Sequence, residues 1–421
     1  MQRRRLTPGR WLALGFSGLI LAGTLLLALP ISRNQPVSWI DLLFTSASAA
    51  CVTGLSVVNT WEAYSGFGKF IIAALIQLGG LGFASFGVGI MLMARQKINF
   101  RERRLVKEAI NYPNFSGMLN VVKFLLKVTV ISELIGSICS FFVFVQNHPV
   151  KDAIGMSLFH AVSSFNNAGF DILPEGTFPY RGDPLFYLVT CGLIIVGGLG
   201  FFVIYEITHH KFSLHTKVVL TMTGILLAAG TVLLVITERF NMGDAFFYSV
   251  SARTAGFAVN SCGDFSMAGI GVLILLMMIG ASPGSTGGGI KTTTTFVLFR
   301  SLLAYSSNSQ VSGFQRKIPG QIVYRSFILL ISALVLISTV TFLLCIAEPD
   351  LALHELLFET VSAFGTVGLS TGITAELCWF SKLILSLTML VGRLGPLTVA
   401  TLWVYHPETA VSRPEESLLI G

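Results

Sequence analysis

The hydrophobic residues of this chain form long runs separated by short polar stretches. A membrane-spanning helix needs about 20 consecutive, mostly apolar residues, and eight runs reach about that length. The pattern therefore predicts eight spanning segments, the sixth of which is interrupted by a glycine-rich stretch. They cover residues 11–31, 67–94, 118–146, 184–208, 214–237, 266–305, 320–347 and 380–405.

Four shorter apolar stretches lie between the two members of each successive pair of spans. Each has 9–14 residues, which suits a half-helix that enters the membrane and turns back, but not a span. The chain is therefore expected to be an all-α integral membrane protein that follows one order four times: span, half-helix, pore loop, span. The half-helices are expected at Trp39–Ala50, Asp152–Phe165, Asp244–Ala252 and Leu353–Phe364. The repeats are expected at 1–95, 96–210, 211–305 and 306–408, with a tail at 409–421.

Composition agrees with a membrane location. Hydrophobic residues make up 53% of the 421 residues and charged residues 12%, whereas soluble domains are about 25% charged. This argues against a soluble enzyme, a nucleic-acid binder or a disordered scaffold. The six cysteines are scattered without metal-ligand spacing and are expected to be small buried apolar residues. No enzyme activity is expected.

Basic residues are distributed unevenly between the two sets of loops. One set, which includes both termini and the segments 95–107 and 300–325, carries 19 of the 28 Lys and Arg residues, and the opposite set carries six. The positive-inside rule predicts that the first set is cytoplasmic, in a multi-pass protein of the cell (inner) membrane. The half-helices would then enter from outside, where 14 acidic residues would attract cations. Ordinary topology bias and solvated loop charge can account for part of this asymmetry.

The four predicted half-helices end in similar sequences. Each is rich in Ser and Thr and leads through a short turn to one glycine, ten residues after an aligned Phe in three copies and nine in the third. Four copies in one chain predict a pseudo-fourfold arrangement about a central axis. The aligned glycines are Gly54, Gly169, Gly256 and Gly368. A second motif follows three of them after 24–28 residues, at 79–83, 197–201 and 392–396.

Loops that meet on such an axis suit the binding of a monovalent cation. Irregular backbone at membrane depth is tolerated only where it is buried or lines a water-filled cavity, and rings of carbonyl oxygens can replace the water shell of an ion. The half-helices would also point the negative ends of their dipoles at the pore. The predicted filter residues are Val52, Thr53, Gly54, Asn167, Ala168, Gly169, Thr254, Ala255, Gly256, Thr366, Val367 and Gly368.

The interruption of the sixth span suggests a gate below this filter. Pro283 and the glycines around it cannot continue a helix, so a flexible constriction is expected, although a loosely packed kink would have the same composition. Arg393 replaces a glycine of the second motif, and a charge within a span is usually functional; it is expected to donate hydrogen bonds to the loop carbonyls and to form a positive barrier. An arginine that reaches the membrane interface is the alternative. The predicted gate residues are Gly280, Ser282, Pro283, Gly284, Ser285, Thr286, Gly287, Gly288, Gly289, Lys291 and Arg393.

Other polar residues near the predicted filter are expected to support it. Arg253 is expected to brace the third loop, through Asp171 or Glu359. Asn166, Asn167 and Asp171 are expected to hold the second loop by side-chain hydrogen bonds. Glu133 lies within a span and receives no role from the sequence.

On these residues the chain resembles the Trk/Ktr/HKT superfamily of potassium transporters, and within it the membrane subunits of Ktr systems. The segments Val52–Leu55, Asn166–Asp171, Arg253–Phe257 and Thr366–Gly372 are similar to the four filter loops of that family. Because all four aligned positions are glycine, the resemblance implies transport of K⁺, with Na⁺ as an activating or coupling ion and no organic cofactor in this chain. It also implies a homodimer, with the tail at the dimer interface, on a cytoplasmic octameric ring that binds ATP or ADP. Membrane lipids are the other expected partner. A sodium-coupled secondary transporter with the same filter remains the alternative.

Overall fold

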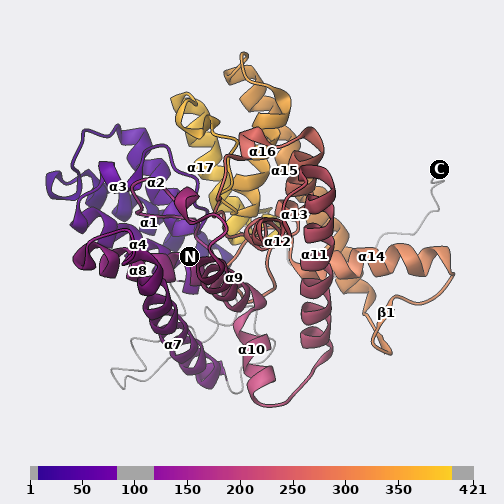
Figure 1. The fold of residues 1–421 in the computed structure, drawn as a ribbon. Coiled ribbons are helices and arrows are strands. Elements are labelled where there is room, and N and C mark those ends of the chain that lie inside the picture. The colour runs from indigo at the N-terminus through magenta and orange to yellow at the C-terminus, as the bar shows by residue number, and fades with distance from the viewer. Residues whose placement is uncertain (1–7, 83–117, 401–421) are drawn as a thin grey trace, which may run out of the picture.

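The computed structural model describes residues 8–82 and 118–400, and this part of the chain is almost entirely helical (Figure 1). One order of elements recurs along it: a long helix, a short helix, and a second helix that ends or breaks at a glycine. The first set contains α1 (Pro8–Ala28), η1 (Pro30–Ser32), α2 (Trp39–Cys51), α3 (Thr60–Ala63) and α4 (Gly66–Leu81). The second contains α7 (Met118–Phe144), α8 (Val150–Phe165), η2 (Phe178–Tyr180), α9 (Pro184–Leu199) and α10 (Phe201–Thr208).

The third and fourth sets follow the same order, except that a longer segment, residues 279–291, separates the two parts of the second helix in the third set. The third contains α11 (Leu214–Glu238), α12 (Met242–Ser251), η3 (Cys262–Asp264), α13 (Met267–Met278) and α14 (Thr292–Ser306). A small antiparallel hairpin, β1 (Ser312–Gly313) and β2 (Arg316–Lys317), leads to the fourth. The fourth contains α15 (Gly320–Ala347), α16 (Leu353–Gly365), η4 (Ile373–Ala375), α17 (Trp379–Leu394) and α18 (Pro396–Ala400).

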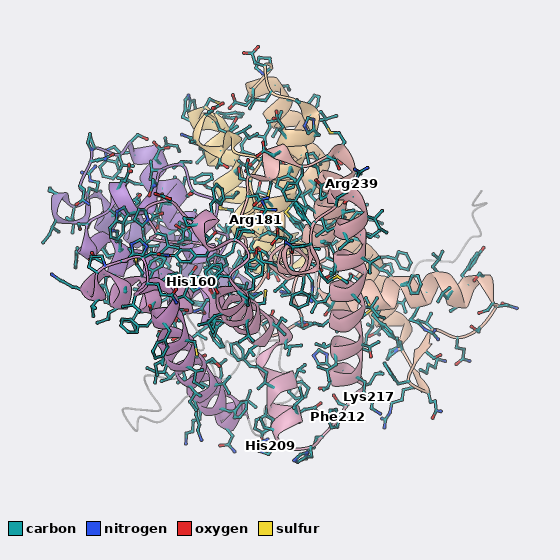
Figure 2. The ribbon with its side chains drawn as sticks, viewed as in Figure 1. His160, Arg181, His209, Phe212, Lys217 and Arg239 are labelled. Atoms are coloured by element: carbon teal, nitrogen blue, oxygen red, sulfur yellow. The ribbon has the colours of Figure 1, made fainter. Side chains whose placement is uncertain are left out.

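The long first helix of each set is a membrane span by length and composition. Within residues 8–82 and 118–400, four helices are long and apolar enough to cross a membrane: α1, α7, α11 and α15. Figure 2 shows α11 as a long upright helix, with Lys217 near its lower end and Arg239 near its upper end. The chain is therefore a multi-pass membrane protein.

The second helices differ from the continuous spans that hydropathy predicts. The predicted span at 184–208 is two helices, α9 and α10, bent by 94°, because Gly200 takes a positive φ of 92°. The predicted span at 380–405 likewise breaks at Gly395 (φ 87°) into α17 and α18. Residues 83–94 and 401–405 of the predicted spans lie outside the described part of the chain.

The four short helices begin and end within two residues of the predicted half-helices. Each packs against the long helix that precedes it, as in the pairs α1·α2, α7·α8, α11·α12 and α15·α16. The aligned Phe of three of them is fully buried, with Phe44, Phe247 and Phe358 at 0% exposure. The buried Ser and Thr hydroxyls of these helices are satisfied by backbone carbonyls, as Thr45 donates to Asp41 O at 2.8 Å.

Polar contacts join neighbouring sets. Lys382 on α17 forms an ion pair with Asp41 on α2, with 2.8 Å between Nζ and Oδ1. Arg181, in the loop before α9, pairs with the buried Asp244 on α12 at 2.8 Å. These links connect the fourth set to the first and the second to the third.

Candidate functional site: a ring of four glycine loops and the loop beneath it

The loops that follow the short helices share one unusual backbone conformation. In each, the residue two places before the aligned glycine is left-handed, and so is the glycine itself. The first group is Val52, Asn167, Thr254 and Thr366, with φ of 59°, 58°, 74° and 50°. The second is Gly54, Gly169, Gly256 and Gly368, with φ of 95°, 67°, 75° and 98°. Non-glycine residues rarely adopt this conformation, so its fourfold recurrence makes these loops the candidate functional site.

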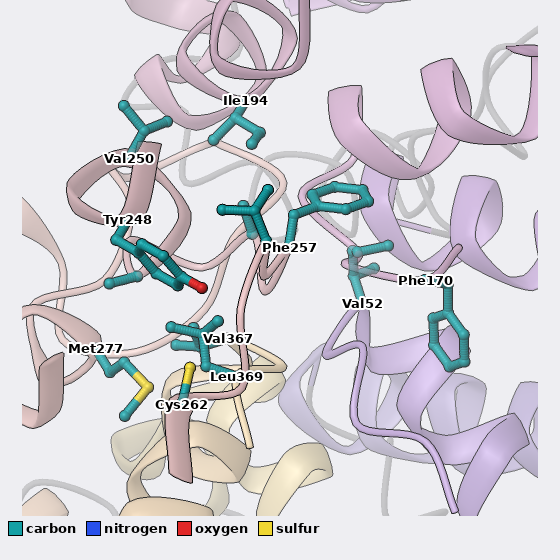
Figure 3. Packing of buried hydrophobic residues seen from close by; sticks show 14 of the residues in the cluster. Val52, Phe170, Ile194, Tyr248, Val250, Phe257, Cys262, Met277, Val367 and Leu369 are labelled. Atoms are coloured by element: carbon teal, nitrogen blue, oxygen red, sulfur yellow. The ribbon is translucent and has the colours of Figure 1, made fainter. Parts of the chain in front are cut away.

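The four glycines contact one another in cyclic order. A Cβ atom on Gly54 would collide with the carbonyl oxygen of Ala168, and one on Gly169 with that of Ala255. A Cβ on Gly256 would collide with Val367 O, and one on Gly368 with Thr53 O, which closes the cycle. Side chains from all four loops also belong to one packed cluster, in which Figure 3 shows Val52, Phe170, Phe257 and Val367. We call this arrangement the glycine ring.

Serine residues at the ends of the short helices hold the ring from behind. Thr53 N–H donates to Ser48 O at 2.8 Å, and the equivalent bonds of the second and fourth loops end on Ser163 and Ser362. In the third loop, Ala255 N–H donates to Ser251 O at 2.9 Å, one residue closer along the chain. This shorter connection compensates for the one residue that the third copy lacks between its aligned Phe and its glycine. These backbone N–H groups of the four loops therefore donate to the ends of the short helices.

The carbonyl oxygens of the ring remain available. In the described part of the chain, no hydrogen bond ends on the carbonyl oxygens of Thr53, Ala168, Ala255 or Val367. Buried carbonyls are normally paired, so a ring of free ones suits an ion that accepts oxygen ligands in place of water.

The second loop is supported by an amide cluster that the sequence indicated only in part. Asn166 Nδ2 donates to Gln77 Oε1 on α4 at 2.7 Å and to Glu133 Oε1 on α7 at 3.3 Å. The next residue, Asn167, lies with its amide 3.2 Å from the hydroxyl of Thr254 in the third loop. Glu133, for which the sequence suggested no role, thus accepts a hydrogen bond from the residue at the base of the ring.

We expect Asn166→Ala to lower the free energy of unfolding by about 1–3 kcal/mol, because it leaves two partly buried acceptors without this donor. Thermal unfolding of the purified protein in detergent measures this. Asn120→Ala, which removes an exposed amide at the start of α7, is the control and should change the free energy by less than about 0.5 kcal/mol. Equal effects of the two substitutions would contradict the role of the cluster.

The prediction that Arg253 supports the third loop through Asp171 or Glu359 is wrong. Arg253 is 7% exposed, yet it forms no ion pair with Asp171 or Glu359 among the described residues, and its Nε has no hydrogen-bond partner. It instead lines a small void with Gly198 and Ala281. Glu359 is satisfied by Ser370, Thr371 and Thr374 of its own loop. The sequence showed which charges lie near the ring, but not which way their side chains point.

The glycine-rich segment 279–291 forms a closed loop under the ring. Its ends are joined, since Gly280 N–H donates to Ile290 O at 2.8 Å. Gly287 lies against Thr254 and Gly288 against Thr366, because a Cβ on either would meet those hydroxyls. The segment therefore contacts the ring at two of its four loops, on the side away from Asp171.

The broken end of α9 anchors this loop. Ser282 N–H donates to Gly198 O at 3.1 Å, and Thr286 N–H to Gly197 O at 3.4 Å. In the opposite direction, Phe201 N–H donates to Gly284 O at 3.0 Å. A helix that stops at a glycine leaves carbonyls without intrahelical partners, and the loop satisfies them. The sequence showed the Gly-Gly-Leu-Gly motif but did not indicate this role.

Two cations hold the loop from within. Arg393 Nη1 donates to Thr286 O, and Nη2 donates to Gly79 O at 2.5 Å and Gly80 O at 2.9 Å. Lys291 Nζ donates to Gly287 O at 2.5 Å. Both cations line a cavity of about 300 Å³ between the loop, α1 and α17. Arg393 thus bridges the loop and the end of α4.

Ser282 stands within a Gly-x-Ser-x-Gly spacing, which in some hydrolases marks a nucleophile. Here the segment follows a helix rather than a strand, and the Ser282 hydroxyl accepts a hydrogen bond from Thr292 at 3.2 Å. Among the described residues, the hydrogen-bond partner of the Ser282 hydroxyl is thus a threonine and not a basic side chain.

Carbonyl oxygens that accept no hydrogen bond from the described residues, arranged in a ring inside a helical membrane protein, are what is expected of a protein that moves cations across a membrane. The sequence matches the family described as TrkH, cation transport protein, over residues 14–242 and 212–413. The chain therefore belongs to the TrkH family of cation transport proteins.

Curated relatives cover nearly the whole chain. Ktr system potassium uptake protein B of Bacillus subtilis is 39% identical, over 99% of this chain and 97% of its own. The potassium/sodium uptake protein NtpJ of Enterococcus hirae is 37% identical, over 100% and 98%. Ktr system potassium uptake protein B of Vibrio alginolyticus is 35% identical, over 98% and 94%. The crystal structure of the potassium transporter TrkH from Vibrio parahaemolyticus matches the fold with a TM-score of 0.76 at 17% identity, over 96% of this chain and 86% of its own.

Proposed function

We propose that the chain is the potassium-translocating pore subunit of a membrane K⁺ uptake system, with the glycine ring as its selectivity filter. The observation that carries this proposal is the cyclic contact of Gly54, Gly169, Gly256 and Gly368 beside carbonyls that accept no hydrogen bond from the described residues. Relatives at 39% and 35% identity are named as potassium uptake proteins. Glycine in all four loops, as in the potassium-selective members that the chain resembles, supports K⁺ as the cargo.

The segment 279–291 is the gate in this proposal, and Arg393 adds a positive barrier below the filter. The loop is held by hydrogen bonds to α9 and by Arg393, so an open state requires those contacts to break. We call the cavity that is lined by Gly54, Gly169 and Asp171 the mouth of the pore. In this proposal the mouth faces outward and both termini face the cytoplasm, as the distribution of basic residues favours. An inside-negative potential then drives K⁺ inward with about 2.3 kcal/mol per 100 mV.

Regulation falls to other subunits in this proposal. The name "Ktr system" of the relatives implies more than one component. Following the family resemblance, we propose a homodimer of this chain with its tail at the interface, on a cytoplasmic octameric ring that binds ATP or ADP.

Rubidium uptake by the purified chain in liposomes tests the proposal. Uptake should follow an imposed inside-negative potential and should be inhibited by K⁺ much more than by Na⁺. No uptake under any potential would contradict a pore. The second candidate, a sodium-coupled transporter, is favoured by the potassium/sodium name of the relative from E. hirae. Uptake that requires a sodium gradient, and not only the presence of sodium, would select it.

The carboxyl group of Asp171 at the mouth of the pore should make potassium uptake sensitive to pH. Asp171 lines a cavity of about 320 Å³ together with Gly54 and Gly169, and burial raises the pKa of its carboxyl to about 6, although a hydrogen bond from Leu173 N–H opposes this. The carboxyl therefore loses its charge as the pH on the mouth side falls through about 6. One charge contributes at most about 1 kcal/mol at 4 Å in water, so uptake at low K⁺ should fall by up to about fivefold.

Rubidium uptake between about pH 7.5 and about pH 5 measures this effect. Asp171→Asn is the matched variant: its uptake should be low and nearly constant over this range. Equal pH dependence of the variant and the unchanged chain would show that another group is responsible.

A further inference from the structure

A groove separates α4 from α8 on the periphery of the molecule, where Figure 1 shows the two helices side by side. Its volume is about 530 Å³, within the range of about 300–1,000 Å³ that is usual for small-ligand sites. Most of its wall is apolar. The wall residues include Phe70, Ala73, Met156, Leu158, Phe159 and Val162.

The groove is open because two glycines lie along it. No atom of residues 8–82 or 118–400 lies within 4 Å of the Cβ position of Gly66 or of Gly155. The neighbouring side chains face outward, with Phe70 67% exposed and Leu158 50% exposed. In a membrane-spanning protein, an apolar groove that opens on such a face opens to lipid rather than to water.

One end of the groove is polar and carries more positive than negative charge. Lys69 and Lys151 line it together with a single carboxylate, that of Asp152. Lys69 Nζ lies 3.7 Å from the centroid of the Trp61 ring. Tryptophan and lysine are typical of the boundary between lipid tails and water, and basic pockets between helices recognise anionic headgroups. Lys151, which is exposed, supplies the charge in excess of Asp152.

We propose that this groove binds one anionic phospholipid, with an acyl chain between α4 and α8 and the headgroup phosphate between Lys69 and Lys151. The apolar wall matches the chain, and the net positive rim matches the phosphate. Ile172 forms part of the same wall and follows Gly169 by three residues. The bound lipid therefore packs against the segment that leads out of the glycine ring and supports the second loop from behind.

Lipid retention tests this proposal without any measurement of transport, so its result is independent of the proposed function. The purified full chain is incubated with equal amounts of phosphatidylglycerol and phosphatidylcholine, washed in detergent, and analysed by native mass spectrometry. The chain should retain one phosphatidylglycerol in preference to phosphatidylcholine. The double variant Lys69→Gln, Lys151→Gln should lower this preference by roughly fivefold per lysine.

A second variant tests the groove itself. Gly155→Leu fills the open space on α8 with a residue that favours helix, so it should abolish the retained lipid while the protein stays folded. Gly192→Leu is the matched control, because Gly192 is an exposed helical glycine on α9 with no atom within 4 Å of its Cβ position; it should retain lipid normally.

Three results would overturn the proposal. Gly155→Leu could retain as much phosphatidylglycerol as the unchanged chain, or Gly192→Leu could lose as much lipid as Gly155→Leu. Alternatively, Gly155→Leu could convert a dimer to a monomer without changing lipid retention, in which case the groove is a contact between two copies of the chain.

Discussion

Replacement of Gly54 by serine should lower the preference for potassium over sodium by about tenfold or more, which corresponds to about 1.4 kcal/mol. Gly54 has a φ of 95°, and its Cβ position lies only 3.0 Å from Gly169 Cα. A serine rarely adopts this φ, and its Cβ would clash with the second loop. The resulting strain of about 1–3 kcal/mol must be relieved by separation of the first two loops. A wider ring of carbonyls no longer fits one ion size.

Competition between rubidium and sodium for uptake into liposomes measures this preference. Gly224→Ser provides the matched control, because Gly224 lies exposed on α11 with no atom within 4 Å of its Cβ position. The control should leave selectivity unchanged. If Gly54→Ser folds and keeps the original selectivity, Gly54 does not line the pathway.

Deletion of residues 284–287 should raise basal potassium flux by about tenfold or more, since each 1.4 kcal/mol removed from the closed state multiplies the open population tenfold. The deletion removes the acceptor Gly284 and the donor Thr286, which make two of the three backbone contacts with the broken junction of α9 and α10. It also removes the carbonyl to which Arg393 donates. Selectivity should persist, because no residue of the glycine ring changes.

Flux through liposomes without any added partner measures the basal rate. A deletion of Phe314 and Gln315, at the exposed tip of the β1–β2 hairpin, is the control for shortening a loop and should leave the rate low. If the protein without residues 284–287 folds and its basal flux stays low, the segment 279–291 is not the gate.

Hydropathy predicted the short helices well because their lengths are set by the pattern itself. Each is an apolar run bounded by polar turns, and α2, α8, α12 and α16 start and stop within two residues of that prediction. The bend at Gly200 was missed because the residues on both sides are apolar, so hydropathy continues through the break. The Gly-Gly-Leu-Gly motif was visible, but its backbone conformation was not.

The partners of individual side chains were the other limit. The sequence placed Arg393 near the glycine-rich loop because repeats align it with Gly80 and Gly198, and the structure places its guanidinium on Thr286 O. For Arg253 no such alignment exists, and the choice between Asp171 and Glu359 rested on charge alone. The serines behind the ring were visible in the repeat, but their hydrogen bonds to the loops depend on how each short helix ends.

The bent end of α9 ties the loop under the ring to the surface of the molecule. Phe201, the first residue of the eight-residue helix α10, donates to Gly284 O, and Glu206 on the same helix accepts hydrogen bonds from Ser213 and Thr216 at the start of α11. In the proposed function, this short helix therefore connects the gate segment at its first residue to the exposed turn 209–212 at its other end. A displacement of that turn is then expected to move the proposed gate, while the carbonyl oxygens of the glycine ring stay in place because the serines of the short helices hold their loops separately.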